Sequence, residues 1–159
     1  MTCRMVILVA ALLAAGTGTT GAPQTNDLVE DVLRNVPKTV PDLAVREVQR
    51  FGTGVMALYD SPDRPATAMP KAIWVTIESY DTDAAAEAGR KRSVDTTSVG
   101  PTRTETVNGL AVTWWQKQRA LAQIGRHVVN VSALRTEAEP LVLKVLQSLV
   151  PGLKTAKGL

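Results

Sequence analysis

The foremost candidates for a functional role in this 159-residue chain are two adjacent tryptophans, Trp114 and Trp115. They lie in a stretch with the alternation of a strand, where neighbouring side chains point to opposite faces of a sheet. Leu110 and Val112 share the parity of Trp114, so we predict that Trp114 faces the core. Trp115 then either lies beneath the loop at residues 93–101 or offers an aromatic binding surface. We take Trp115 as a candidate binding residue.

The densest group of cations is Arg90-Lys91-Arg92. Arginine side chains bind phosphate and acidic partners, which makes Arg90 and Arg92 two further candidate binding residues. The plainer interpretation is that these cations complement the dipole at the end of a helix.

His127 is the single histidine, and its ordinary pKa near neutrality suits acid–base chemistry. A zinc site would need several nitrogen or sulfur ligands, and the chain has one cysteine, Cys3. No G-x-S-x-G motif is present to mark a nucleophilic serine. We therefore assign no catalytic residue and expect a structural role for His127. A hydrolase that uses His127 with carboxylates from loops is the enzymatic alternative.

Two further patterns suggest ligands but fit turns better. Gly52-Thr53-Gly54 begins a G-x-G-x-x-A match, yet the residues after it favour a strand over the helix that a dinucleotide site needs. The carboxylates of residues 60 and 63, and of 81 and 83, are too few for calcium and suit turns and helix caps. We predict no cofactor and no metal.

The candidate residues must be held by secondary structure. We predict a four-strand antiparallel meander over residues 104–134. Asn108-Gly109 predicts a tight hairpin turn because both residues tolerate positive φ, and Gly125-Arg126 marks a second turn. Residues 71–80 alternate as a clear strand, and residues 44–59 give two more strands that turn at Gly52. The sequence leaves open whether those two pair with each other or with the meander.

Apolar residues at helical spacing predict three helices, at residues 28–36, 84–92 and 141–149. The second is rich in alanine, and Pro151-Gly152 is expected to end the third, with a frayed tail after residue 152. We predict an α+β fold: one domain with an antiparallel sheet and helices packed on one face. Residues 23–41 form the first helix and a linker, and residues 42–159 form the domain.

The amino terminus predicts export. Arg4 precedes an apolar run at residues 5–15, and small residues follow. The run is about half of the ~20 residues needed to span a bilayer. We therefore predict a signal peptide at residues 1–22, cleaved between 16 and 22, and no integral membrane span in the mature chain. Removing it takes away Cys3, and the remaining 17 Lys+Arg against 15 Asp+Glu give a charge of +2.

An exported domain without cysteine depends on its core alone and is typical of a bacterial protein of the periplasm or the extracellular space. Its charges are interspersed, which excludes a nucleic-acid-binding arm. We expect a binding domain rather than an enzyme, with a protein or cell-envelope component as its partner near Trp115. An inhibitor or accessory subunit that acts through its N-terminal helix is the other alternative.

Overall fold

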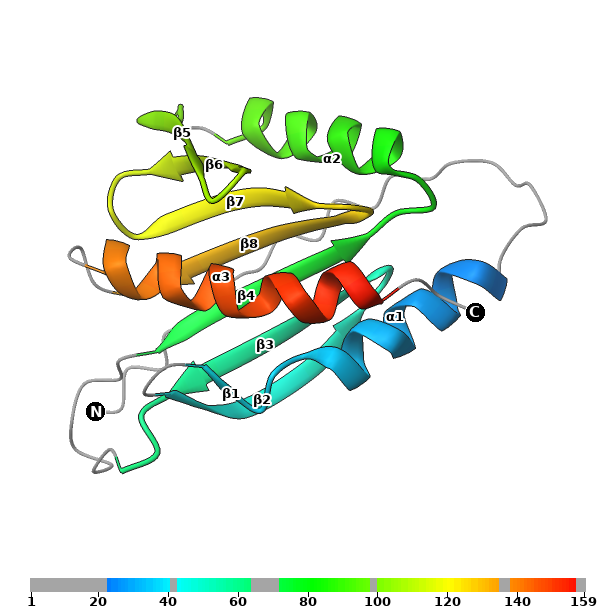
Figure 1. The fold of residues 1–159 in the computed structure, drawn as a ribbon, viewed down its shortest axis with the longest axis horizontal. Helices are drawn as coiled ribbons and strands as arrows, with labels where there is room; N and C mark the ends of the chain where they lie inside the picture. The colour runs from blue at the N-terminus through cyan, green and yellow to red at the C-terminus, as the bar shows by residue number, and fades with distance from the viewer. Residues whose placement is uncertain (1–22, 41–42, 64–71, 98–99, 135–137, 157–159) are drawn as a thin grey trace, which may run out of the picture.

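The computed structural model describes residues 23–40, 43–63, 72–97, 100–134 and 138–156. The predicted signal peptide and the signal cleavage site lie outside these residues. One eight-stranded antiparallel sheet carries three helices, so the predicted α+β class is confirmed (Figure 1). The strands are β1 (Thr39–Val40), β2 (Leu43–Phe51), β3 (Gly54–Asp60), β4 (Ile73–Ser79), β5 (Arg103–Val107), β6 (Leu110–Trp115), β7 (Arg119–Ile124) and β8 (His127–Ala133). The helices are α1 (Pro23–Asn35), α2 (Asp83–Asp95) and α3 (Glu139–Thr155).

The sheet consists of two four-strand meanders. Its order is β1-β2-β3-β4-β8-β7-β6-β5, so the meanders join where β4 pairs antiparallel with β8. The second meander is the predicted one, and both residues of its first turn have positive φ, 52° at Asn108 and 77° at Gly109. The open question about the first strands is settled: β2 pairs with β3, and β3 pairs with β4. Strand β1 is a two-residue strand within the predicted linker.

Two of the three helices lie on one face of the sheet, and the third lies on the other. The main core contains Val29 of α1 and Val145 of α3 together with the strand residues that share the parity of Trp114. The second cluster contains Ala86 of α2 with Trp115, Leu121 and Val128, whose side chains point the opposite way. The expectation of one helix-covered face therefore holds for α1 and α3 but not for α2. Figure 1 shows α3 crossing the sheet, with α1 along one end of it.

Helix α2 packs closely because its inner face is small. Thr82 caps it, with its Oγ1 accepting a hydrogen bond of 3.1 Å from the amide of Ala85. Gly89 is buried against the ring of Tyr80, where even a Cβ atom would not fit. The alanine-rich sequence of α2 accounts for this close approach.

Helix α3 continues past its predicted end. It runs through Pro151 to Thr155, which corrects the expected stop at Pro151-Gly152. The reason is burial: Leu153 and Ala156 both lie in the main core. Gly152 lets α3 pass close to the end of α1, because a Cβ atom there would lie 2.9 Å from the carbonyl oxygen of Asn35. Core packing therefore outweighs the cost of about 3 kcal/mol that proline imposes inside a helix.

Among the helices of the described residues, none has the length and apolar character needed to cross a membrane.

Candidate functional site

Trp114 and Trp115 lie on opposite faces of β6, as their parity predicts. Trp114 is fully buried in the main core, which confirms its predicted place. Trp115 is 6% exposed and belongs to the second cluster, where Ala86 and Val94 of α2 cover it. Trp115 is therefore covered, so its ring is not an exposed aromatic surface, but the cover among the described residues is helix α2 and not the expected loop at residues 93–101.

What lies on the ring of Trp115 is an arginine. Arg119 is the residue directly opposite Trp115 in the β6–β7 pair, and its guanidinium carbon lies 4.8 Å from the centre of the indole ring. At this distance the cation and the ring attract each other. The Nε atom of Arg119 donates a hydrogen bond of 3.0 Å to Oδ1 of Asn130 on β8. The stacking on Trp115 and the hydrogen bond of Nε together hold the guanidinium in a fixed place on the sheet.

Arg119 faces an open depression of about 470 Å³. The residues with polar side chains that line it include Thr97, Thr102, Ser132, Gln116 and Gln118. Ser132 lies directly opposite Arg119 on β8, and Trp74 lies directly opposite Ser132 on β4. A row of side chains that runs Trp74, Ser132, Arg119, Trp115 thus crosses four neighbouring strands on this face.

Arg119 also lines a smaller depression of about 90 Å³. Thr76, Asn130 and Glu78 contribute to its lining. The carboxylate of Glu78 accepts a hydrogen bond of 2.7 Å from the hydroxyl of Tyr80 and forms no ion pair with Arg119. Burial, together with this hydrogen bond to Glu78, raises the pKa of Tyr80 to about 12.

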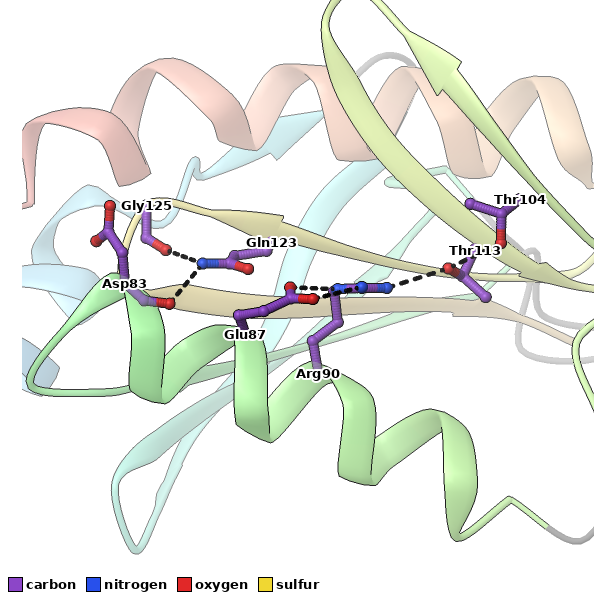
Figure 2. A network of polar contacts seen from close by, with 7 residues as sticks. All are labelled: Asp83, Glu87, Arg90, Thr104, Thr113, Gln123 and Gly125. Carbon is purple, nitrogen blue, oxygen red and sulfur yellow. Dashed lines mark hydrogen bonds and ion pairs between the residues drawn. The ribbon is translucent and has the colours of Figure 1, made fainter.

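Arg90 is engaged in hydrogen bonds within the protein and does not present its guanidinium to an open site. Its guanidinium donates two hydrogen bonds to Glu87, of 2.8 and 2.9 Å, and a third of 3.5 Å to Oγ1 of Thr113 on β6. Figure 2 shows this chain of contacts running from α2 to the sheet and on to Thr104. In the same view, Nε2 of Gln123 donates to the carbonyl oxygens of Asp83 and Gly125 and fixes the start of α2.

Arg92 is exposed on α2, and the structure does not bring it together with Trp115 in one site. Arg90 and Arg92 therefore form no joint cationic site beside Trp115. The cation that does contact Trp115 is Arg119, which sequence reasoning missed. The available signal was the short turn at residues 116–118, which places Arg119 opposite Trp115 once the hairpin register is known.

His127 is buried, at 1% exposure, on the face that α3 covers. Its Nε2 lies 3.4 Å from the carbonyl oxygen of Ala156, which can only accept, so Nε2 carries the proton. Nδ1 then accepts a hydrogen bond of 3.0 Å from the buried hydroxyl of Ser79. Burial lowers the pKa of His127 below its ordinary value, and the bond to Ala156 opposes the shift in part. This geometry joins β4, β8 and the end of α3, and His127 lines neither depression beside Arg119.

The remaining motifs have turn geometry. Gly52 has a φ of 48° in the hairpin between β2 and β3, so the glycine pattern precedes a strand and not a helix. Oδ1 of Asp60 accepts a hydrogen bond of 2.8 Å from the amide of Ser61, as in a turn. Within the described residues, no three His, Cys, Asp or Glu side chains gather in a way that could hold a metal ion.

The apolar stripe of the N-terminal helix α1 is buried against the rest of the protein. Leu28, Val29 and Val32 of α1 are all buried, and Val29 and Val32 belong to the main core. A partner that approached α1 would therefore meet its polar side, for example Glu30, which pairs with Arg50 of β2 at 3.0 Å.

Comparisons of the chain with models of protein families, with curated proteins and with solved structures give no match.

Proposed function

We propose that this protein is a non-catalytic binding domain that takes a ligand from the cell envelope into the 470 Å³ depression beside Arg119. One observation carries the proposal: a partly buried guanidinium, stacked on Trp115, faces this depression. Small-molecule sites are concave and combine apolar walls with a few fixed polar groups. Ala133 and Leu134 supply apolar surface, and Ser132 and Gln118 supply hydrogen-bonding groups.

In this proposal Trp115 does not itself contact the ligand, contrary to the expectation from the sequence, but supports Arg119, which does. Its ring face is covered by Arg119, so a ligand meets the guanidinium first. Trp115 is a positioning residue that holds the cation toward the depression. Its packing against Leu121 and Val128 in turn keeps the indole ring in one place.

The test is a thermal-shift and calorimetric screen of the purified protein against sugars, organic acids, lipids and peptides. A ligand at a hundredfold over its Kd adds about 2.7 kcal/mol of stability, which is readily measured. Ser132→Phe should fill the depression and abolish binding of any ligand found. Thr106→Phe, on the exposed edge strand β5, is the matched control and should bind normally.

Cooperative melting of both variants shows that they fold. If a ligand binds to Ser132→Phe as tightly as to the unchanged protein, the depression is not the site and the proposal fails.

The proposal includes export, on the basis of Arg4 and the apolar run that follows it. Cells that express the chain should release or retain in the envelope a mature form whose mass corresponds to cleavage between residues 16 and 22. Recovery of the uncleaved chain in the cytosol would contradict export. That result would leave the binding site untouched, because the depression lies within the described domain.

A further inference from the structure

Two arginines stack on the two adjacent tryptophans, one on each face of the sheet. Arg103 lies 5.0 Å from the ring centre of Trp114, and Arg119 lies 4.8 Å from that of Trp115. The two pairs differ in what neutralises the cation. Arg103 forms ion pairs with Glu105 at 3.3 Å and with Glu139. For Arg119, the described part of the chain supplies no ion pair.

The missing carboxylate matters because Arg119 is partly buried. Burial disfavours the charged form of a group, and it lowers the pKa of Arg119. A guanidinium stays charged even so, and a charge withdrawn from water is costly unless an opposite charge or hydrogen bonds compensate it. Asn130 compensates through Nε with a neutral amide oxygen. The two Nη groups have no hydrogen bond to any residue in the described ranges.

The free edge of the guanidinium has a defined shape. With Nε engaged by Asn130, the remaining donors are Nη1 and Nη2, which lie in one plane at the end of the side chain. Two parallel N–H groups in a plane match the two oxygens of a carboxylate. The hydroxyl of Ser132, which is directly opposite on β8 and forms no hydrogen bond within the described chain, is a further donor beside this edge.

The charge of the depression selects among oxyanions. Of the described residues that line it, Arg119 alone is charged. One fixed positive charge balances a carboxylate, which carries one negative charge. A phosphate monoester carries ≈ −1.5 to −2 at pH 7 and would keep uncompensated charge here. With Arg119 as the one cation among the described lining residues, the charge balance favours a carboxylate over a phosphate.

We propose that the ligand of this depression carries a carboxylate, which binds end-on to Nη1 and Nη2 of Arg119. This inference rests on the proposed binding function and adds the chemical class of the ligand. A carboxylate of this kind occurs in sugar acids and in N-acylated amino acids, and the experiment below separates these two sources.

The experiment compares each acid with a neutral counterpart that has the same shape. Glucuronate is paired with glucose, and N-acetylalanine with N-acetylalaninamide. Binding to the full chain is followed by calorimetry and by the NMR signals of the tryptophan indole N–H groups. We expect one acid to bind at least about tenfold more tightly than its neutral counterpart, because hydrogen bonds to a charged group are worth ≈ 1.5–3 kcal/mol. Which pair responds identifies the source.

Variants assign the effect to Arg119. Arg119→Met removes the charge and should abolish the preference for the acid. Arg119→Lys keeps the charge but lacks the planar pair of donors, so we expect an affinity between those of the unchanged protein and Arg119→Met. Arg92→Met, an exposed arginine on α2, is the matched control and should bind like the unchanged protein.

The outcomes separate this inference from the proposed function. If a ligand binds, Ser132→Phe abolishes the binding, and Arg119→Met leaves it unchanged, the carboxylate inference is overturned and the binding site stands. Equal affinity for an acid and its amide, or binding of inorganic phosphate in preference to every acid, also overturns it. If Ser132→Phe has no effect on a bound acid, the proposed site itself is wrong. If Arg119→Met does not melt cooperatively, the comparison rests on Arg119→Lys.

Discussion

The hydroxyl of Ser79 lies 3.0 Å from Nδ1 of His127, and both groups are buried beneath the end of α3. A serine and a histidine at this distance resemble part of a catalytic triad. Here, however, the other ring nitrogen faces the carbonyl oxygen of Ala156, and α3 covers the pair. The arrangement holds two strands and a helix end together, which is a structural task.

The buried His127, paired with Ser79, makes the free energy of unfolding depend on pH. Because the folded pKa of His127 lies below its ordinary value, the unfolded chain binds more protons once the pH falls below about 6.5. Stability is therefore full above that pH and is lost as the pH falls through the folded pKa. The expected slope is at most about 1.4 kcal/mol per pH unit, and urea unfolding between pH 7.5 and 5 measures it.

His127→Gln provides the comparison for that slope. It removes the only histidine, so its stability should change less between pH 6.5 and 5 than that of the unchanged protein, although it is lower at pH 7. The same slope in both proteins would assign the pH dependence to other groups.

The second meander could be predicted from sequence because its signals are local. Asn108-Gly109 fixes a turn, and the alternation on either side fixes which face each residue takes, so Trp114 was placed correctly in the core. The face covered by α2 could not be predicted in this way. A helix whose inner residues include Ala86 and Gly89 has almost no apolar stripe, and only the crossover from β4 to the far edge strand β5 determines its side.

The candidate site was predicted only in part for a similar reason. Trp115 was singled out, but the arginine that stacks on its ring lies on another strand. Arg119 contacts it only because a turn with Gln116 at a φ of 56° sets the register between β6 and β7. A positive φ at glutamine has no clear sequence signature. The end of α3 was missed because the burial of Leu153 and Ala156 is a tertiary effect that Pro151 does not reveal.

Gly89→Ala should destabilise the protein, although alanine favours helices. A Cβ atom at residue 89 would lie 2.3 Å from the hydroxyl oxygen of Tyr80 and 2.4 Å from its Cζ, so α2 or the ring must move. We expect a loss of about 1–3 kcal/mol, as for other overpacked cores, in place of the usual gain of roughly 0.5–1 kcal/mol. Urea unfolding of Gly89→Ala alone and together with Tyr80→Leu measures the contact. A Gly89→Ala loss of equal size in the Tyr80→Leu background would show that the contact is not its cause.

Arg90 and Arg92 should differ although they are two residues apart on the same helix. Arg90→Met removes the hydrogen bonds to Glu87 and the contact with Thr113, and we expect a loss of about 0.5–1 kcal/mol. Arg92→Met changes an exposed side chain and should stay within about 0.5 kcal/mol of the unchanged protein. Chemical unfolding of the two variants side by side tests this difference. A larger loss from Arg92→Met would contradict a structural role confined to Arg90.

Trp114 should stabilise the fold through the hydrogen bond of its indole N–H as well as through the apolar area that it buries. Nε1 donates a hydrogen bond of 2.8 Å to Oε1 of Glu105, the carboxylate that also pairs with Arg103. Trp114→Phe keeps a buried ring but removes this donor and part of the packing, so we expect a loss of about 2–4 kcal/mol. A double-mutant cycle with Glu105→Met, which removes the acceptor, isolates the hydrogen bond: the two losses should be less than additive, with a coupling of roughly 0.5–3 kcal/mol. Additive losses would mean that Trp114 stabilises the core through packing alone and that Glu105 acts only on Arg103.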